Sequence, residues 1–229
     1  MKTALVTGAS RGIGREVAQT LARDGWQVIA VVRNATSAPK QTRPEVVEMA
    51  DPQSIAALAR RLVKQDERLD ALVNNAGMYT GHASDIWRVN VLGPLLLTRA
   101  LDPLLAHGAR VVMVTSGLGA RAAQPASLVK RLSDPALSLE DIETLAAEAP
   151  GGYGASKAAL NAMARVFAAR FADRAILVNA VSPGWARTDM GGRNAPRSVQ
   201  QGAASVLWGV TLSAAGPTGG VFEDGKPID

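Results

Sequence analysis

Residues 3–14 of this 229-residue chain read Thr-Ala-Leu-Val-Thr-Gly-Ala-Ser-Arg-Gly-Ile-Gly. The first five residues are apolar or β-branched, which is typical of a buried strand. Apolar residues at Ile13, Val17 and Leu21 then recur at the spacing of one helix face. The stretch therefore predicts a strand over Thr3–Thr7, a glycine-rich turn and a helix, in that order.

The glycines of this turn indicate what it can bind. A phosphate group reaches the backbone N–H groups at a helix N-terminus only where no Cβ intervenes. Turns are glycine-rich in general, but three glycines between a first strand and a first helix favour dinucleotide binding. The residues expected to contact the cofactor here are Gly8, Ser10, Arg11, Gly12, Ile13 and Gly14.

The rest of the chain alternates apolar runs of strand length with helical periodicity. Further strands are expected at 26–32, 46–49, 69–73, 110–115, 176–181 and 220–222, and further helices at about 55–62, 85–106, 152–171 and 198–212. Only a turn is expected between Gly77 and Asn90. Strands that are apolar throughout and separated by helices predict a parallel sheet covered on both faces. The expected fold is α/β, a single-domain, doubly wound, Rossmann-like parallel sheet over residues 1–229 with helices on both faces.

The composition argues against several classes of protein. The chain has no cysteine and only two histidines, so we expect no disulfide, no metal site and no Ser-His-Asp triad. The net charge of +5 comes mainly from scattered arginines, and aromatic residues make up 4%, which argues against nucleic-acid binding. No apolar run reaches the roughly 18–20 residues of a membrane span. We expect a cytoplasmic protein with neither a nucleic-acid nor a membrane partner.

The end of the second expected strand bears on the choice of cofactor. An acidic residue there binds the ribose hydroxyl of NAD, whereas an arginine accommodates the 2′-phosphate of NADP. Here Val32 is followed by Arg33, and Arg11 lies within the glycine turn. Two guanidinium groups converging on one phosphate favour NADP(H), although Arg33 also fits a solvated residue at a strand end.

A tyrosine and a lysine are spaced one helical turn apart. Tyr153 and Lys157 lie on one face of the expected helix at 152–171. A phenol titrates near 10 in water and is a poor base at neutral pH, but a neighbouring ammonium favours the phenolate. The pair therefore predicts acid/base chemistry, provided that other site residues accompany it.

With these residues in place, the chain resembles the short-chain dehydrogenase/reductase family. Besides the glycine turn and the Tyr153–Lys157 pair, the resemblance is carried by Ser116 after an apolar strand. It is also carried by the motifs Asn-Asn-Ala-Gly at 74–77, Val-Asn-Val at 89–91 and Pro-Gly-Trp-Ala-Arg-Thr at 183–188. The resemblance covers essentially the whole chain. The stretch at 182–190 is similar to that of the monomeric carbonyl reductases.

The resemblance implies a role for each matching residue. Tyr153 would exchange a proton with the substrate oxygen, Ser116 would hydrogen-bond the same oxygen, and Lys157 would lower the pKa of the tyrosine and bind the nicotinamide ribose. Asn90 would bend its helix and support a water that connects Lys157 to solvent. Further cofactor contacts are expected from Glu48, Asn75, Ala76, Gly77, Pro183, Gly184, Trp185 and Thr188.

The segment at about 121–150 has a helical pattern of its own and is expected to be a helical insertion within the domain. In the monomeric carbonyl reductases, helices inserted here cover the face through which most relatives pair their subunits. The resemblance therefore favours a monomer and leaves a dimer open.

The expected substrate is a small, mainly apolar aldehyde, ketone or quinone. The candidate pocket residues are mostly apolar, which suits such a compound better than a phosphorylated sugar. They are Met78, Tyr79, Leu118, Gln124, Trp185 and Met190. The alternative that stays open is a non-catalytic NADP-binding sensor or signalling protein on the same fold. A sugar-nucleotide epimerase is disfavoured, because the short stretch after Gly184 cannot build a substrate lobe.

Overall fold

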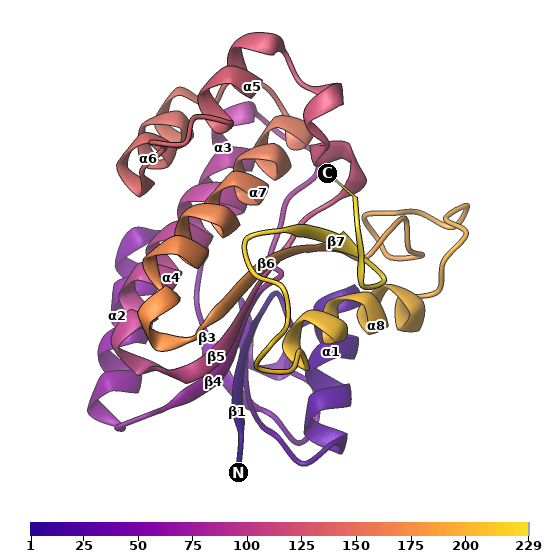
Figure 1. The fold of residues 1–229 in the computed structure, drawn as a ribbon. Helices are drawn as coiled ribbons and strands as arrows, with labels where there is room; N and C mark the ends of the chain where they lie inside the picture. Colours follow the sequence, from indigo (N-terminus) through magenta and orange to yellow (C-terminus); the bar gives the residue numbers. More distant parts are fainter. Residues whose placement is uncertain (229) are drawn as a thin grey trace.

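The computed structural model describes residues 1–228, and its centre is an eight-stranded sheet in the order β3-β2-β1-β4-β5-β6-β7-β8 (Figure 1). Neighbouring strands from β3 to β7 are parallel, and β8 pairs antiparallel with β7. The chain order reverses between β1 and β4, the position where ligands bind in doubly wound folds. The strands are β1 (Thr3–Thr7), β2 (Gln27–Val32), β3 (Arg43–Val46), β4 (Leu69–Asn74), β5 (Leu105–Val114), β6 (Leu177–Ser182), β7 (Val221–Glu223) and β8 (Lys226–Pro227).

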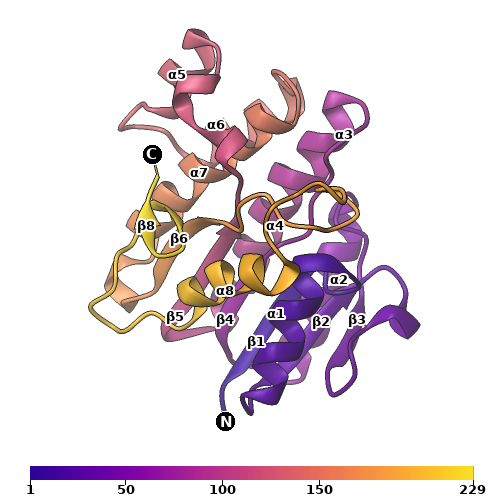
Figure 2. The same ribbon diagram turned by 90° about the vertical axis from the view of Figure 1, so that its right-hand side faces the viewer.

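Helices cover both faces of this sheet, as Figures 1 and 2 show. One face carries α1 and α8, and the other carries α2, α4 and α7. The helices are α1 (Gly12–Arg23), α2 (Pro52–Lys64), α3 (Ala83–Trp87), α4 (Gly93–Leu101), α5 (Ala126–Leu132), α6 (Leu139–Glu148), α7 (Tyr153–Arg170) and α8 (Val199–Val210). Short 3-10 turns occupy 35–37, 102–104, 117–119, 121–123 and 172–174, and a π-helical turn occupies 88–92.

The core consists of two apolar layers, one on each face of the sheet. All residues of β1 and β6 are buried, because a central parallel strand has helices on both sides. Leu5 points into the layer with α2, α4 and α7, whereas Val6 points into the layer with α1 and α8. The α/β class, the doubly wound topology and the covering of both faces are therefore confirmed.

Several element boundaries differ from the sequence prediction, and one strand was not predicted. The third strand is at 43–46 rather than 46–49, because Val47 and Met49 are buried by packing beyond the paired segment. The helix predicted to end at 106 stops at 101, where Pro103 introduces a 3-10 turn, and β5 then starts at Leu105. The final antiparallel strand β8 was not predicted.

The region between Gly77 and Asn90 is not only a turn, because it contains α3. This helix runs on through the π turn at 88–92 into α4. The Trp87 indole nitrogen donates a 2.8 Å hydrogen bond to the Gly151 carbonyl, just before α7. The buried Trp87 side chain and its hydrogen bond thus stabilise α3, although the sequence of this stretch shows little helical periodicity.

The segment at 121–150 forms α5 and α6, which lie outside α7 and α3 (Figure 1). Helix α6 begins with a capping box, in which Ser138 and Asp141 each accept a hydrogen bond from the other's backbone N–H. Arg99 of α4 forms ion pairs of 2.6 Å with both Glu140 and Glu143 of α6. Within residues 1–228, no helix is long and apolar enough to cross a membrane.

Candidate active site

The candidate site residues come together at one edge of the sheet, where the parallel strands end. β1, β4, β5 and β6 are consecutive neighbours. The loops that follow them carry the glycine turn, the segment from Asn75 to Tyr79, Ser116, and the segment from Pro183 to Thr188. Residues far apart in the sequence therefore share this edge, as the fold class predicts.

The glycine turn packs closely against the loop after β4. Gly8 has φ +66°, and a Cβ on it would lie 2.9 Å from the Cα of Ala76. A Cβ on Gly14 would lie 2.2 Å from the side-chain nitrogen of Asn75, so no larger residue fits. Arg11 precedes α1 and supplies no side-chain cap, which leaves the first N–H groups of the helix available to an anion.

Thr7, which sequence reasoning did not single out, joins the two loops. Its hydroxyl accepts 2.9 Å hydrogen bonds from the backbone N–H groups of Asn75 and Ala76. The Asn75 side chain in turn donates a 2.8 Å hydrogen bond to the Thr7 carbonyl. The signal available in the sequence was a polar residue at the end of an otherwise apolar strand.

Asn90 is 1% exposed and connects three segments. Its side-chain oxygen accepts from the Met78 N–H at 2.8 Å, and its nitrogen donates to the Met78 carbonyl at 2.9 Å. The same nitrogen donates to the Ser156 hydroxyl at 3.0 Å, and Ser156 donates to the Tyr153 carbonyl at 2.7 Å. Asn90 lies in the π turn, which departs from α-helical geometry at this amide. Ser156 was not among the predicted site residues.

Ser116, Tyr153 and Lys157 lie together beside this network. The Ser116 side chain lies beside the Tyr153 phenol, close enough to lower its pKa. The Lys157 ammonium lies 5.5 Å from the centroid of the Tyr153 ring and donates a 2.7 Å hydrogen bond to the Val114 carbonyl. A Cβ on Gly77 would lie 3.7 Å from this ammonium, so the loop after β4 also borders it.

Burial governs the protonation of both titratable groups. It is the largest cause that raises the pKa of Tyr153 above its ordinary value; the hydrogen bond with Ser116 opposes the rise, and the nearby Tyr79 hydroxyl adds to it. Burial also lowers the pKa of Lys157 to about 8. In the protein alone the pKa of Tyr153 is therefore raised, whereas the sequence led us to expect that Lys157 would lower it.

Apart from Lys157, the charged residues predicted near the cofactor are exposed. Arg33 follows β2, and Glu48 follows β3, where its carboxylate accepts a 3.2 Å hydrogen bond from the Ala50 N–H. Arg11 forms a 2.8 Å ion pair with Asp189, and both side chains are about 70% exposed. The guanidinium of Arg11 is thus directed toward the loop after β6 in the protein alone.

That loop approaches the glycine turn through Thr188. A Cβ on Gly12 would lie 3.2 Å from the Thr188 methyl group. Gly184, at φ +65°, starts the loop, and its N–H donates to Ser182, whose hydroxyl donates to Glu223 at 2.6 Å. Trp185 donates through its indole nitrogen to the Gly191 carbonyl at 2.8 Å.

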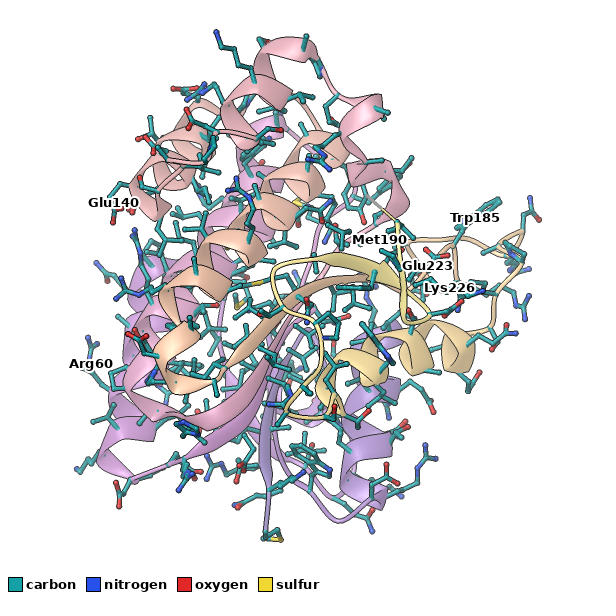
Figure 3. The ribbon with its side chains drawn as sticks, in the orientation of Figure 1. Arg60, Glu140, Trp185, Met190, Glu223 and Lys226 are labelled. Carbon is teal, nitrogen blue, oxygen red and sulfur yellow. The ribbon has the colours of Figure 1, made fainter. Side chains whose placement is uncertain are left out.

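Four of the six candidate pocket side chains are exposed apolar groups on these loops. Figure 3 shows Trp185 and Met190 on the loop after β6. Gln124 instead donates a 2.9 Å hydrogen bond to the Leu118 carbonyl and holds the turn after Ser116. The Met78 side chain is partly buried. The exposed four are Tyr79 (47% exposed), Leu118 (54%), Trp185 (58%) and Met190 (46%).

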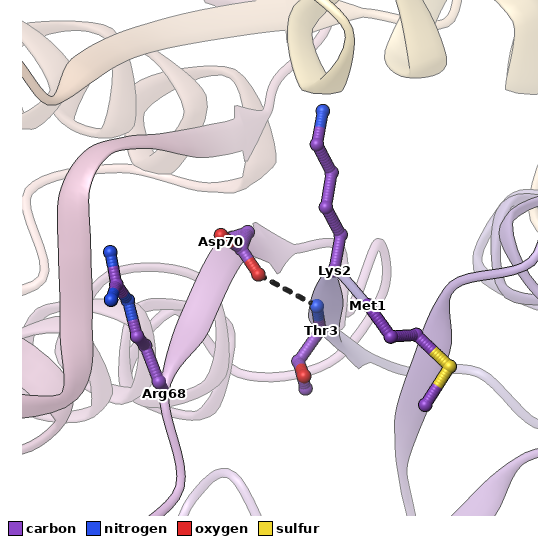
Figure 4. Close-up of a pocket in the computed structure, with 5 residues that line it drawn as sticks. All are labelled: Met1, Lys2, Thr3, Arg68 and Asp70. Carbon is purple, nitrogen blue, oxygen red and sulfur yellow. Dashed lines mark hydrogen bonds between the residues drawn. The ribbon is translucent and has the colours of Figure 1, made fainter.

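A separate cavity of about 470 Å³ lies at the opposite end of the sheet (Figure 4). It is lined by Met1, Lys2, Thr3, Arg68 and Asp70, at the starts of β1 and β4. The Asp70 carboxylate accepts a 2.8 Å hydrogen bond from the Thr3 N–H. None of the candidate site residues lines this cavity, so it is not part of the site. Within residues 1–228, no cluster of three or more His, Cys, Asp or Glu residues could hold a metal ion.

Comparison with known proteins agrees with this arrangement. The model of the short chain dehydrogenase family matches residues 2–127, and that of the enoyl-(acyl carrier protein) reductase family matches residues 140–208. The chain belongs to the short-chain dehydrogenase family. It is 30% identical to carbonyl reductase [NADPH] 1 of Sus scrofa over 100% of this chain and 94% of that protein.

Solved structures of two reductases have the same fold. Salutaridine reductase from Papaver somniferum superimposes with a TM-score of 0.83 at 24% identity, over 98% of this chain and 100% of that one. The NADPH-bound carbonyl reductase from chicken fatty liver superimposes with a TM-score of 0.77 at 25% identity, over 100% of this chain and 98% of that one. The predicted family resemblance is confirmed.

In this short-chain dehydrogenase the buried Lys157 ammonium costs stability. Because its pKa is about 8 when folded and 10.5 ordinarily, the cost is complete below pH 8 and disappears as pH rises toward 10.5. We expect Lys157→Met to raise the melting temperature at pH 7 by roughly 2–6 °C, since loss of the hydrogen bond to Val114 offsets part of the gain. Thermal unfolding between pH 7 and 10.5 measures this difference.

The matched control is Lys64→Met, because Lys64 is an exposed lysine in the last turn of α2. We expect Lys64→Met to cause no comparable rise in the melting temperature at pH 7. The burial argument would be contradicted if Lys157→Met melted at a lower temperature than the unmodified chain at pH 7. It would also be contradicted if the difference in melting temperature between the two proteins grew above pH 8.

Proposed function

We propose that this short-chain dehydrogenase is an NADP(H)-dependent oxidoreductase acting on a small, mainly apolar aldehyde, ketone or quinone, or on the corresponding alcohol. One observation carries the proposal: the Tyr153 phenol lies beside the Ser116 side chain and has the Lys157 ammonium 5.5 Å from its ring. The similarity to a protein named carbonyl reductase [NADPH] supports it.

The glycine turn fits a dinucleotide. Gly8 and Gly14 leave no room for a side chain, and the uncapped start of α1 offers N–H groups to a pyrophosphate. Arg33, exposed at the end of β2, is available for a 2′-phosphate. Arg11 reaches the same phosphate when it gives up its exposed ion pair with Asp189. We further assign cofactor contacts to Glu48, Asn75, Ala76, Gly77, Pro183, Gly184, Trp185 and Thr188.

Bound NADPH supplies the hydride that reduces the carbonyl carbon. Tyr153 donates a proton to the carbonyl oxygen, and its raised pKa keeps the phenol protonated for that step. Ser116 hydrogen-bonds the same oxygen and holds it within reach of the phenol. Lys157 restores the proton to Tyr153, and its pKa of about 8 allows it to do so near neutral pH. Asn90 supports the path from Lys157 to solvent.

The exposed apolar side chains on the surrounding loops suit an apolar substrate. Tyr79 and Trp185 are the aromatic residues with more than a third of their surface exposed in the described chain, and both lie on loops at this edge. Exposed apolar groups gathered at one place are typical of binding sites. A sensor without catalysis has no observation in its favour, because Tyr153 and Lys157 are both present and lie together.

The same proposal includes the organisation of the chain. Residues 1–229 form one catalytic domain, and 121–150 are a helical insertion within it. Helix α6 packs on the π turn that leads into α4, and its Glu140 and Glu143 pair with Arg99 of α4, which supports an α4 side that is closed to another subunit. We therefore favour a monomer. A cytoplasmic location and the lack of a nucleic-acid partner stay predictions.

The first test is Tyr153→Phe with NADPH and benzaldehyde. Removing the proton donor is expected to lower kcat by about 10²–10⁴-fold, because that is the usual contribution of general acid catalysis. The cofactor dissociation constant, measured by calorimetry, is expected to stay within about threefold of the original. Substantial turnover by this variant would contradict the assignment of Tyr153 as the acid.

The cofactor assignment predicts that Arg33→Ala narrows the preference for NADPH over NADH by about tenfold, the value of one charge-assisted hydrogen bond. Binding constants for both cofactors measure the effect. Arg60→Ala is the matched control, because Arg60 is exposed on α2 on the far side of the molecule from Trp185 (Figure 3). Equal affinity of the unmodified protein for NADH and NADPH would refute the NADP assignment.

If α6 closes the α4 side, the protein is a monomer, and its molar mass in solution is expected to be that of one chain. Light scattering at micromolar protein measures it. A tetramer would contradict the proposal, since the α4 side could then not be closed by α6.

A further inference from the structure

The two tyrosines of the chain lie against each other. The ring centroids of Tyr79 and Tyr153 are 4.9 Å apart, and the ring planes are inclined by 72°. This edge-type contact is a favoured arrangement of aromatic pairs. Tyr79 is 47% exposed, so its ring touches the proposed catalytic residue on one side and solvent on the other.

The backbone that carries Tyr79 is held firmly. Met78, the preceding residue, has both its N–H and its carbonyl bonded to the Asn90 side chain. Through Ser156, the same Asn90 side chain is connected to the Tyr153 carbonyl. One buried amide therefore fixes the backbone of both tyrosine segments, and the gap between the two rings is set by the fold.

The other side of the phenol is equally restricted. The turn at 117–119 packs on α7, since a Cβ on Gly154 would lie 2.8 Å from the Leu118 carbonyl. The Ser116 hydroxyl accepts a 3.2 Å hydrogen bond from the Leu118 N–H and so is fixed in place. A carbonyl oxygen that reaches both Ser116 and Tyr153 brings its own carbon substituents close to the Tyr79 ring.

We propose that Tyr79 is a specificity-determining residue of this site, which admits aldehydes and flat, unbranched ketones and rejects ketones that branch next to the carbonyl. The inference rests on the proposed function. A flat substituent lies along the aromatic ring, whereas a branched one must occupy the space of the ring itself. The Asn90 hydrogen bonds hold the backbone beside Tyr79, so the ring can move aside only by rotating its own side chain, which gives up the contact with the Tyr153 ring.

The test compares benzaldehyde with pivalophenone, a ketone with a tert-butyl group next to the carbonyl, for the unmodified protein and for Tyr79→Ala and Tyr79→Phe. In Tyr79→Ala, kcat/KM for pivalophenone relative to benzaldehyde is expected to rise by about tenfold or more, because a steric clash is removed. In Tyr79→Phe the ratio is expected to stay unchanged, because the ring remains.

Val63→Ala is the matched control, because Val63 is an apolar side chain 53% exposed on α2, and its ratio is expected to stay unchanged. The calorimetric affinity of each variant for NADPH reports whether it has folded. An unchanged ratio in Tyr79→Ala, with cofactor binding intact, overturns the inference. The inference is also overturned if Tyr79→Phe raises the kcat/KM ratio of pivalophenone to benzaldehyde as much as Tyr79→Ala does. If the unmodified protein binds NADPH and reduces neither compound, it is the proposed function that fails.

Discussion

The contact between the end of β1 and the end of β4 is the constraint on which the site depends. The Thr7 hydroxyl and the Asn75 amide hold the two loops together, and this closeness tolerates no Cβ on Gly8 or Gly14. The contact lies where the strand order reverses, which is the position where ligands bind in doubly wound folds. A looser junction would remove both the phosphate cradle and the support of the loop that carries Tyr79.

The second feature is a buried charge kept for function. Lys157 is 4% exposed, and its ammonium donates a hydrogen bond to the Val114 carbonyl. Burying an ammonium with so little compensation costs free energy, and a sequence selected only for stability would place an apolar residue there. The cost yields a lysine whose pKa is near 8 next to a phenol whose pKa is raised, a pair suited to passing a proton.

The Asn90 amide connects these two features. It is bonded to the backbone of Met78 and to Ser156, and thereby joins the loop after β4 to the first turn of α7. Such a fully bonded buried amide orders its surroundings more strongly than an apolar side chain could. The position of the proposed proton donor and that of its aromatic neighbour Tyr79 are consequently set by one side chain.

The sequence by itself determined the fold class, the family and the grouping of Tyr153, Lys157 and Ser116, because strand and helix periodicity and short motifs are local signals. It missed Thr7 and Ser156, placed the third strand too late, and overlooked α3, since these depend on partners far away in the chain. Only the tertiary structure decided that burial raises the pKa of Tyr153, and that Arg11 faces Asp189. Desolvation and ion pairing depend on the whole surroundings of a group, and residue spacing carries no record of them.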